Sequence, residues 1–153
     1  MAVARQDGHI TYLSRHAFKE KFGRRLQERD AVSYDLAEAD FAVESYLRYQ
    51  GERFVERFDA NTYLVMSRAL TYFDLALPDA FAGARAAYRL LSFSSDFMYP
   101  PSDSVELAEA LEANGLDVEH VCLETTYGHD SFLLEEAAQA PHIRAALEVV
   151  ARV

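Results

Sequence analysis

The sequence predicts an α/β protein, and in particular one part of a larger α/β fold. The segment 1–78 has mainly helical periodicity, whereas strand-like and helical runs alternate over 79–153. Only two strand-like runs are present, and two parallel strands alone do not make a stable sheet, because parallel sheets are buried on both faces. We therefore expect a helical region, residues 1–78, followed by a βαβα region, residues 79–153, at the edge of a sheet whose other strands lie outside this sequence.

The composition is that of a globular protein and argues against several kinds of binding partner. The chain has 153 residues, of which 50% are hydrophobic and 26% charged, which is typical of one globular domain. A formal charge of −10 argues against binding to nucleic acid or to an anionic membrane surface. The single cysteine, Cys122, excludes an internal disulfide and any multi-cysteine metal site. The first residues carry no apolar leader and no run is apolar enough to span a membrane, so we expect a cytoplasmic protein.

Three helices are expected in the first half. Ser14 is placed to cap a helix over 15–23, and Gly23 stands where a helix-ending glycine belongs. The segment 42–58 carries an apolar stripe at helical spacing, and Asp59 is placed to cap a third helix directly after it.

The second half is expected to form a parallel βαβ unit. The elements are a strand at 88–93, a helix at about 103–114, a strand at 118–123 and two final helical stretches separated by Pro141. Asp103 and Glu106 have the spacing of a capping box, and Gly115 would end the helix. A strand, a helix and a second strand at this spacing favour parallel pairing.

One acidic residue and one histidine follow the two strands. Asp96 lies in the loop after the first strand, and His129 lies in the loop after the second. Functional groups of open parallel sheets lie in such loops, so we expect the two side chains to meet. An aspartate that orients an imidazole and a histidine that moves a proton are two members of a nucleophilic triad. The order of aspartate and then histidine is that of the α/β-hydrolases.

The third member, the nucleophile, is not found. A Gly-x-Ser-x-Gly elbow is absent, because the residues two places after the six glycines are Ile, Arg, Arg, Arg, Asp and Asp. Cys122 lies within the second strand and is expected to be a small core residue rather than a replacement nucleophile. The remaining histidines have no metal-ligand spacing, so no metal site is expected.

Several segments together are similar to a known family. They are GHITYLS at 8–14, KFGRR at 21–25, FAVESYLRYQG at 41–51, FVERFDANTY at 54–63, SFSSDFMYPP at 92–101 and YGHDSF at 127–132. These motifs resemble the homoserine O-acetyltransferase family, whose members are acyltransferases of the α/β-hydrolase fold. The resemblance covers the carboxyl-terminal half of the family's length, so that 1–78 corresponds to part of a helical lid and 79–153 to the last part of the core.

The resemblance implies a ping-pong acyl transfer in methionine biosynthesis. The acyl group of acetyl-CoA, or of succinyl-CoA in some relatives, passes to an enzyme serine and then to the hydroxyl of L-homoserine. Asp96 matches the triad acid and His129 the triad base. Because the nucleophile serine has no counterpart here, the chain alone is expected to be inactive, and its partner would be the amino-terminal half of the enzyme or a second chain that supplies it.

Three further residues match substrate-binding positions of that family. Asp130 matches the residue that receives the homoserine ammonium, and Arg5 and Tyr12 match positions that hold its carboxylate. A zwitterionic substrate indeed needs opposite charges at the two ends of its pocket. The alternatives are that Asp130 only caps the following helix and that Tyr12 is a core residue.

Two other interpretations remain open from the sequence. One is a related enzyme that uses succinyl-CoA or acylates serine, since both pockets lie partly outside the sequence. The other is a non-catalytic product of a truncated or split gene that acts by pairing with a partner chain. An exposed sheet edge also favours self-association, so a homodimer is expected.

Overall fold

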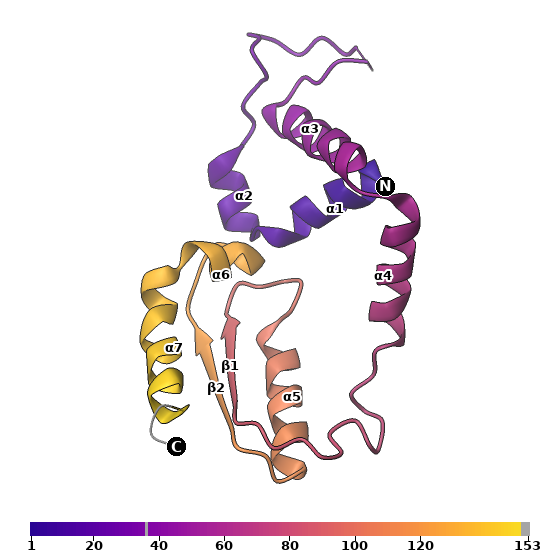
Figure 1. The fold of residues 1–153 in the computed structure, drawn as a ribbon. Helices are drawn as coiled ribbons and strands as arrows, with labels where there is room; N and C mark the ends of the chain where they lie inside the picture. Colours follow the sequence, from indigo (N-terminus) through magenta and orange to yellow (C-terminus); the bar gives the residue numbers. More distant parts are fainter. Residues whose placement is uncertain (36, 151–153) are drawn as a thin grey trace. The chain divides into compact units, whose positions relative to one another are not determined.

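The computed structural model describes residues 1–35 and 37–150, which belong to two compact units (Figure 1). The first unit contains Met1–Ile10 and Phe18–Ala76. The second contains Thr11–Ala17 and the chain from Leu77 onward, and it carries both strands.

The described part of the chain before residue 76 contains one helix more than the sequence predicts. The helices are α1 (Ala2–Tyr12), α2 (Arg15–Lys21), α3 (Ala42–Arg57) and α4 (Ala60–Tyr72). The unexpected helix, α1, has no acidic residue in its first turn and contains Gly8, so its local helix signal is weak. It packs closely on α3, because a Cβ at Gly51 would lie 3.0 Å from the Ala2 carbonyl oxygen. Packing against α3 thus stabilises a helix that the local sequence pattern does not predict.

The three predicted helices are confirmed together with their caps. Ser14 Oγ accepts a hydrogen bond from Ala17 N–H at 3.1 Å, and Gly23 follows α2 with φ +53°. Asp59 Oδ1 accepts from Thr62 N–H at 2.8 Å at the start of α4. At the start of α3, Phe41 N–H donates to the Glu44 carboxylate at 2.9 Å. Each of these side chains accepts a hydrogen bond from a backbone N–H at a helix start that has no partner within the helix.

Aromatic rings join the helices of the first unit. The buried Phe22 ring lies 5.0 Å from the rings of both Phe18 and Tyr46. The buried Phe54 ring stacks on Phe58 at 4.8 Å. Such pairs add stabilisation beyond the area that they bury.

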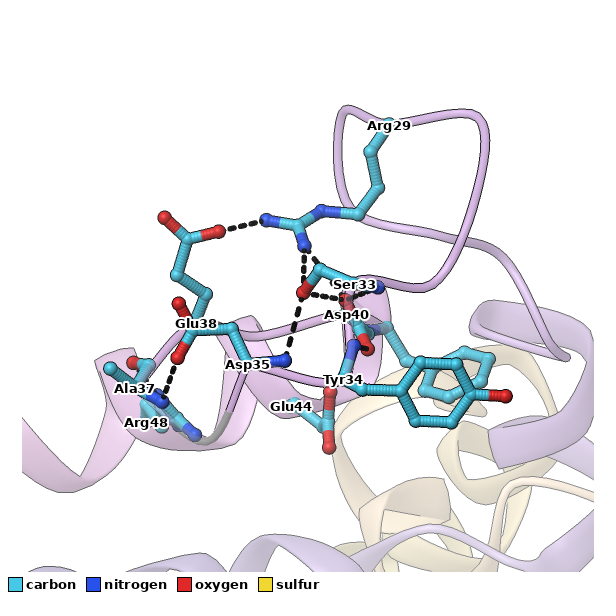
Figure 2. A network of polar contacts seen from close by, with 10 residues as sticks. Arg29, Ser33, Tyr34, Asp35, Ala37, Glu38, Asp40, Glu44 and Arg48 are labelled. Atoms are coloured by element: carbon cyan, nitrogen blue, oxygen red, sulfur yellow. Dashed lines mark hydrogen bonds and ion pairs between the residues drawn. The ribbon is translucent and has the colours of Figure 1, made fainter.

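Arg29 and Asp40 are the centre of a polar network in the described residues between α2 and α3 (Figure 2). The Arg29 guanidinium donates to Asp40 Oδ1 and Glu38 Oε2, each at 2.7 Å. Ser33 donates to the same Asp40 oxygen from its backbone N–H and its hydroxyl. The Ser33 N–H is the main cause that lowers the pKa of Asp40 below its usual range. Polar contacts therefore hold together residues 29–35 and 37–40, which form neither helix nor strand.

The second unit contains the predicted parallel strands. Strand β1 (Tyr88–Phe93) pairs with β2 (Val118–Leu123), with Tyr88 opposite Val118 and Phe93 opposite Leu123. Helix α5 (Pro101–Ala113) connects them and packs on both strands. After β2 come the short 3-10 helix η1 (Gly128–Asp130), α6 (Ser131–Leu134) and α7 (Glu136–Val150). The predicted βαβ unit is thus confirmed, and the sheet within the described residues has two strands.

Helix α5 begins two residues before the predicted start. Pro101 occupies its first turn, where a missing N–H costs nothing because no helical acceptor precedes it. Asp103 consequently lies inside the first turn, and the predicted capping box with Glu106 is wrong. The predicted end is correct, since Gly115 follows with φ +72°.

The break between the last two helices lies at Glu135 rather than at Pro141. Helix α7 continues through Pro141, although proline removes one N–H from the helix interior. At Glu135 the backbone leaves the helical region, with φ −99° and ψ 49°. The Gln139 amide bridges this break by donating to the carbonyl oxygens of Ser131, Phe132 and Glu135. A side-chain bridge of this kind cannot be deduced from the position of a proline.

The prediction that Cys122 is a small core residue is wrong. Its side chain is exposed and not part of a core, although it lies within β2, one residue before the strand ends. The helix that connects the strands provides the buried centre instead, through Leu111. The exposure is local to Cys122, because its register partner Ser92 in β1 is buried.

No helix in the described ranges combines the length and the apolar character that crossing a membrane requires.

Asp59 is predicted to make the stability of the first unit depend on pH. The Thr62 N–H is the main cause that lowers the pKa of Asp59. Because the folded-state pKa lies below the unfolded one, the stabilisation is complete above the usual aspartate range and is lost as the pH falls through the lowered value. Asp59→Asn keeps a capping oxygen but does not titrate, so its thermal midpoint should depend less on acid than that of the parent chain.

The measurement is thermal unfolding followed by circular dichroism, from neutral pH down to about pH 2. Asp59→Ala, which removes the cap, should lower the midpoint already at neutral pH. Equal acid dependence of the parent chain and Asp59→Asn would contradict the assignment.

Candidate active site

The two loops that follow β1 and β2 meet at one edge of the sheet. Beyond the strands, Ser94 N–H donates to the Leu123 carbonyl oxygen at 2.9 Å, so the pairing continues into the loops. Asp96 lies in the first loop, where its N–H donates to the Phe93 carbonyl oxygen. His129 lies in η1, after the second loop. The topology therefore brings together the two residues that the sequence singled out.

The Asp96 carboxylate is buried, with 6% of the residue exposed, and both of its oxygens are used. Oδ1 accepts hydrogen bonds from the backbone N–H groups of Met98 and Tyr99, each at 2.9 Å. Oδ2 lies 2.8 Å from Nδ1 of His129. Two backbone donors thus fix the carboxylate, and the remaining oxygen faces the imidazole.

This contact determines where the neutral imidazole carries its proton. An ionised carboxylate can only accept, so Nδ1 of His129 must donate and Nε2 retains its lone pair. Three aromatic rings surround the imidazole, those of Tyr12, Tyr99 and Phe132, at centroid distances of 5.9, 5.2 and 5.3 Å. The imidazole is therefore oriented by a buried charge and confined by rings, which suits a group that takes up a proton at Nε2.

The three predicted substrate-binding residues, Tyr12, Asp130 and Arg5, do not share one environment. The Tyr12 ring lies beside the imidazole ring of His129. Asp130 is half-buried at the start of α6, but its side chain makes no capping hydrogen bond there. Arg5 belongs to the first unit, where its guanidinium lies over the Phe54 ring at 5.4 Å. Tyr12 is therefore next to His129 in space, and Asp130 is the residue that follows it in the chain.

A group of hydroxyl side chains that the sequence did not predict lies beside Asp96 and His129. Ser95 Oγ lies 3.1 Å from Thr125 Oγ1, and Ser131 Oγ donates to the same Thr125 oxygen at 2.9 Å. Thr125 and Ser131 are buried. Their signal in the sequence is the density of serine and threonine on both sides of Asp96 and His129, which is also typical of ordinary loops and helix starts.

Gly128 lets the backbone before His129 approach the end of α1. It has φ +74°, and a Cβ there would lie 2.8 Å from Leu13 C and 2.9 Å from Tyr12 O. Ser14 contacts the same loop, because its N–H donates to the Tyr127 carbonyl oxygen and its hydroxyl to that of Thr126. Only glycine combines this conformation with this approach.

Among the described residues, no three His, Cys, Asp or Glu side chains gather in a way that could hold a metal ion. The prediction of no metal site remains a prediction.

Solved structures define the fold class. The chain superposes on homoserine O-acetyltransferase from Bacillus anthracis with a TM-score of 0.74 at 15% identity, over 95% of this chain and 39% of that one. It superposes on the esterase E22 L374D mutant with a TM-score of 0.77 at 21% identity, over 95% of this chain and 41% of that one. These proteins are α/β-hydrolases, so the chain has part of the α/β-hydrolase fold.

Sequence relatives define the family. The chain is 51% identical to homoserine O-acetyltransferase from Mesorhizobium japonicum, over 89% of this chain and 36% of that enzyme. It is 51% identical to homoserine O-acetyltransferase from Solidesulfovibrio magneticus, over 90% of this chain and 36% of that enzyme. No family model matches the sequence. The chain belongs to the homoserine O-acetyltransferase family, and it spans about a third of the length of these relatives.

Gly128→Ala is predicted to destabilise the second unit by about 3 kcal/mol or more, because strain at positive φ adds to a backbone clash. Gly83→Ala is the matched control. Gly83 also has positive φ, +78°, but a Cβ there meets nothing within 4 Å. The control should therefore lose only about 1 kcal/mol. Urea unfolding measures both, and equal losses would contradict the close approach.

Proposed function

We propose that this chain provides the acid–base part of a homoserine O-acyltransferase. The observation that carries the proposal is the 2.8 Å contact between the buried Asp96 carboxylate and Nδ1 of His129. Membership of the homoserine O-acetyltransferase family supports homoserine as the acyl acceptor and acetyl-CoA as the donor. The nucleophile comes from a segment that contains the Gly-x-Ser-x-Gly-type elbow, which this sequence lacks.

In the first half-reaction, Nε2 of His129 takes the proton of the nucleophile hydroxyl as that oxygen attacks the thioester carbonyl. The bond between the carbonyl carbon and sulfur then breaks, and the proton goes to the CoA sulfur. An acyl-serine ester remains. Asp96 holds the ring orientation throughout and stabilises the imidazolium while it exists.

In the second half-reaction, Nε2 of His129 takes the proton of the homoserine hydroxyl, whose oxygen attacks the acyl-serine ester. The ester bond to the serine breaks, and the proton returns to the serine oxygen. One imidazole thus acts once as base and once as acid in each half-reaction.

Asp130, Tyr12 and Arg5 are proposed to bind homoserine. Asp130 would receive the ammonium, and this is supported by its position next to His129 and by a carboxylate that α6 does not use as a cap. Tyr12 would contact the substrate beside the imidazole, supported by its ring contact with His129. Arg5 would receive the carboxylate, and only the family resemblance supports this role.

The wider setting is also a proposal. The reaction would belong to methionine biosynthesis in the cytoplasm, and the working enzyme would be a homodimer. Succinyl-CoA as donor and serine as acceptor are the alternatives that the experiment below distinguishes.

The test compares the chain alone with a chimera in which it replaces the matching 36% of the Mesorhizobium japonicum enzyme. The chain alone should form no O-acetylhomoserine, because it lacks the nucleophile, whereas the chimera should form it. Mass spectrometry of the product is the readout, because the exposed Cys122 would react with the thiol reagents that detect free CoA. Succinyl-CoA and serine are offered in parallel.

Variants of the chimera test the assigned roles. Asp96→Asn and His129→Gln should each lower kcat by about 10⁴-fold, as loss of the orienting acid or of the base does in triad enzymes. His142→Gln, in α7, is the histidine control and should leave kcat unchanged. Full activity of His129→Gln, or turnover by the chain alone, would refute the proposal.

A further inference from the structure

The two loops are joined by a pair of hydrogen bonds between consecutive residues. His129 Nδ1 donates to Asp96 Oδ2 at 2.8 Å. One residue earlier on each loop, Gly128 N–H donates to Ser95 Oγ at 2.9 Å. The residues 95–96 and 128–129 thus face each other through two neighbouring bonds, one from the backbone and one from the imidazole.

Thr125 anchors the Ser95 side of this arrangement. Its Oγ1 lies 3.1 Å from Ser95 Oγ and accepts from Ser131 Oγ at 2.9 Å. Its backbone N–H donates to Ser94 Oγ at 3.0 Å. Thr125 is 9% exposed and Ser131 0%, so water has little access to replace these bonds. A buried hydroxyl network of this kind gives one geometry, because breaking any member leaves polar groups unsatisfied.

We propose that Ser95 and Thr125 are positioning residues for His129, a role that rests on the proposed function of His129 as the base. The hydrogen bond to Asp96 and the surrounding aromatic rings act on the imidazole itself, but they do not fix the backbone that carries it. The bond from Gly128 to Ser95 fixes the peptide unit directly before His129, and Thr125 fixes the Ser95 hydroxyl. Ser14 holds the same loop from its other side, through the carbonyl oxygens of Thr126 and Tyr127.

The proposal makes a spectroscopic prediction that needs no catalysis. In the full chain labelled with ¹⁵N, the Nδ1 proton of His129 should exchange slowly with water, and so should the amide proton of Gly128. In Ser95→Ala and Thr125→Val, both protons should exchange at least about fivefold faster, which corresponds to the loss of one net hydrogen bond. Thr125→Ser keeps the hydroxyl and should restore slow exchange.

Matched controls separate positioning from general loss of stability. Ser102→Ala removes an exposed hydroxyl from the start of α5, and Thr126→Val removes the exposed hydroxyl next to Thr125. Neither should change the two exchange rates. Amide exchange in β1 and β2 reports global unfolding, and the expected acceleration is confined to Gly128 and His129.

Three outcomes would overturn the proposal. They are unchanged exchange in a folded Ser95→Ala, failure of Thr125→Ser to restore the rates, and acceleration spread evenly over the strands. In the chimera, Ser95→Ala should lower kcat more than it changes KM. Absence of acyl transfer in the parent chimera, with the exchange pattern as predicted, would refute the proposed function and leave the positioning role intact.

Discussion

The structure of the candidate site depends on one interaction, the hydrogen bond from His129 Nδ1 to the buried Asp96 carboxylate. The carboxylate is stable in its buried position because two backbone N–H groups bind its other oxygen. A fixed acceptor in turn determines which imidazole nitrogen carries the proton, and hence which one can accept a proton from a substrate. The parallel pairing of β1 and β2 makes the interaction possible, because it brings the two following loops to the same edge of the sheet.

A second constraint is the shape of the backbone before His129. Gly128 has a positive φ and lies against the backbone of Tyr12, Leu13 and Ser14, so no larger side chain fits. Ser14 and Ser95 bind this short stretch from two sides. The histidine is therefore oriented both through its ring and through its backbone, and two different sets of contacts produce that orientation.

Much of this site could be predicted from the sequence, since strand periodicity identified both strands and the chain order of parallel strands implied that Asp96 and His129 meet. What could not be predicted depends on contacts between distant residues. Helix α1 is stabilised by its packing on Gly51, and the break at Glu135 is bridged by Gln139. The hydroxyl network around Thr125 lies in segments that look like ordinary polar loops. Cys122 is exposed although its register partner Ser92 is buried, and a strand pattern does not distinguish two such neighbours.

The measurement that tests the central claim most directly is ¹⁵N nuclear magnetic resonance of the His129 imidazole in the unmodified chain. It shows which of the two ring nitrogens carries the proton. The Asp96 contact predicts the form with the proton on Nδ1 and a bare Nε2, and the His129→Gln variant assigns the signals by removing them. A ring protonated at Nε2, or one that averages between the two neutral forms, would show that Asp96 does not orient the imidazole and would contradict the account.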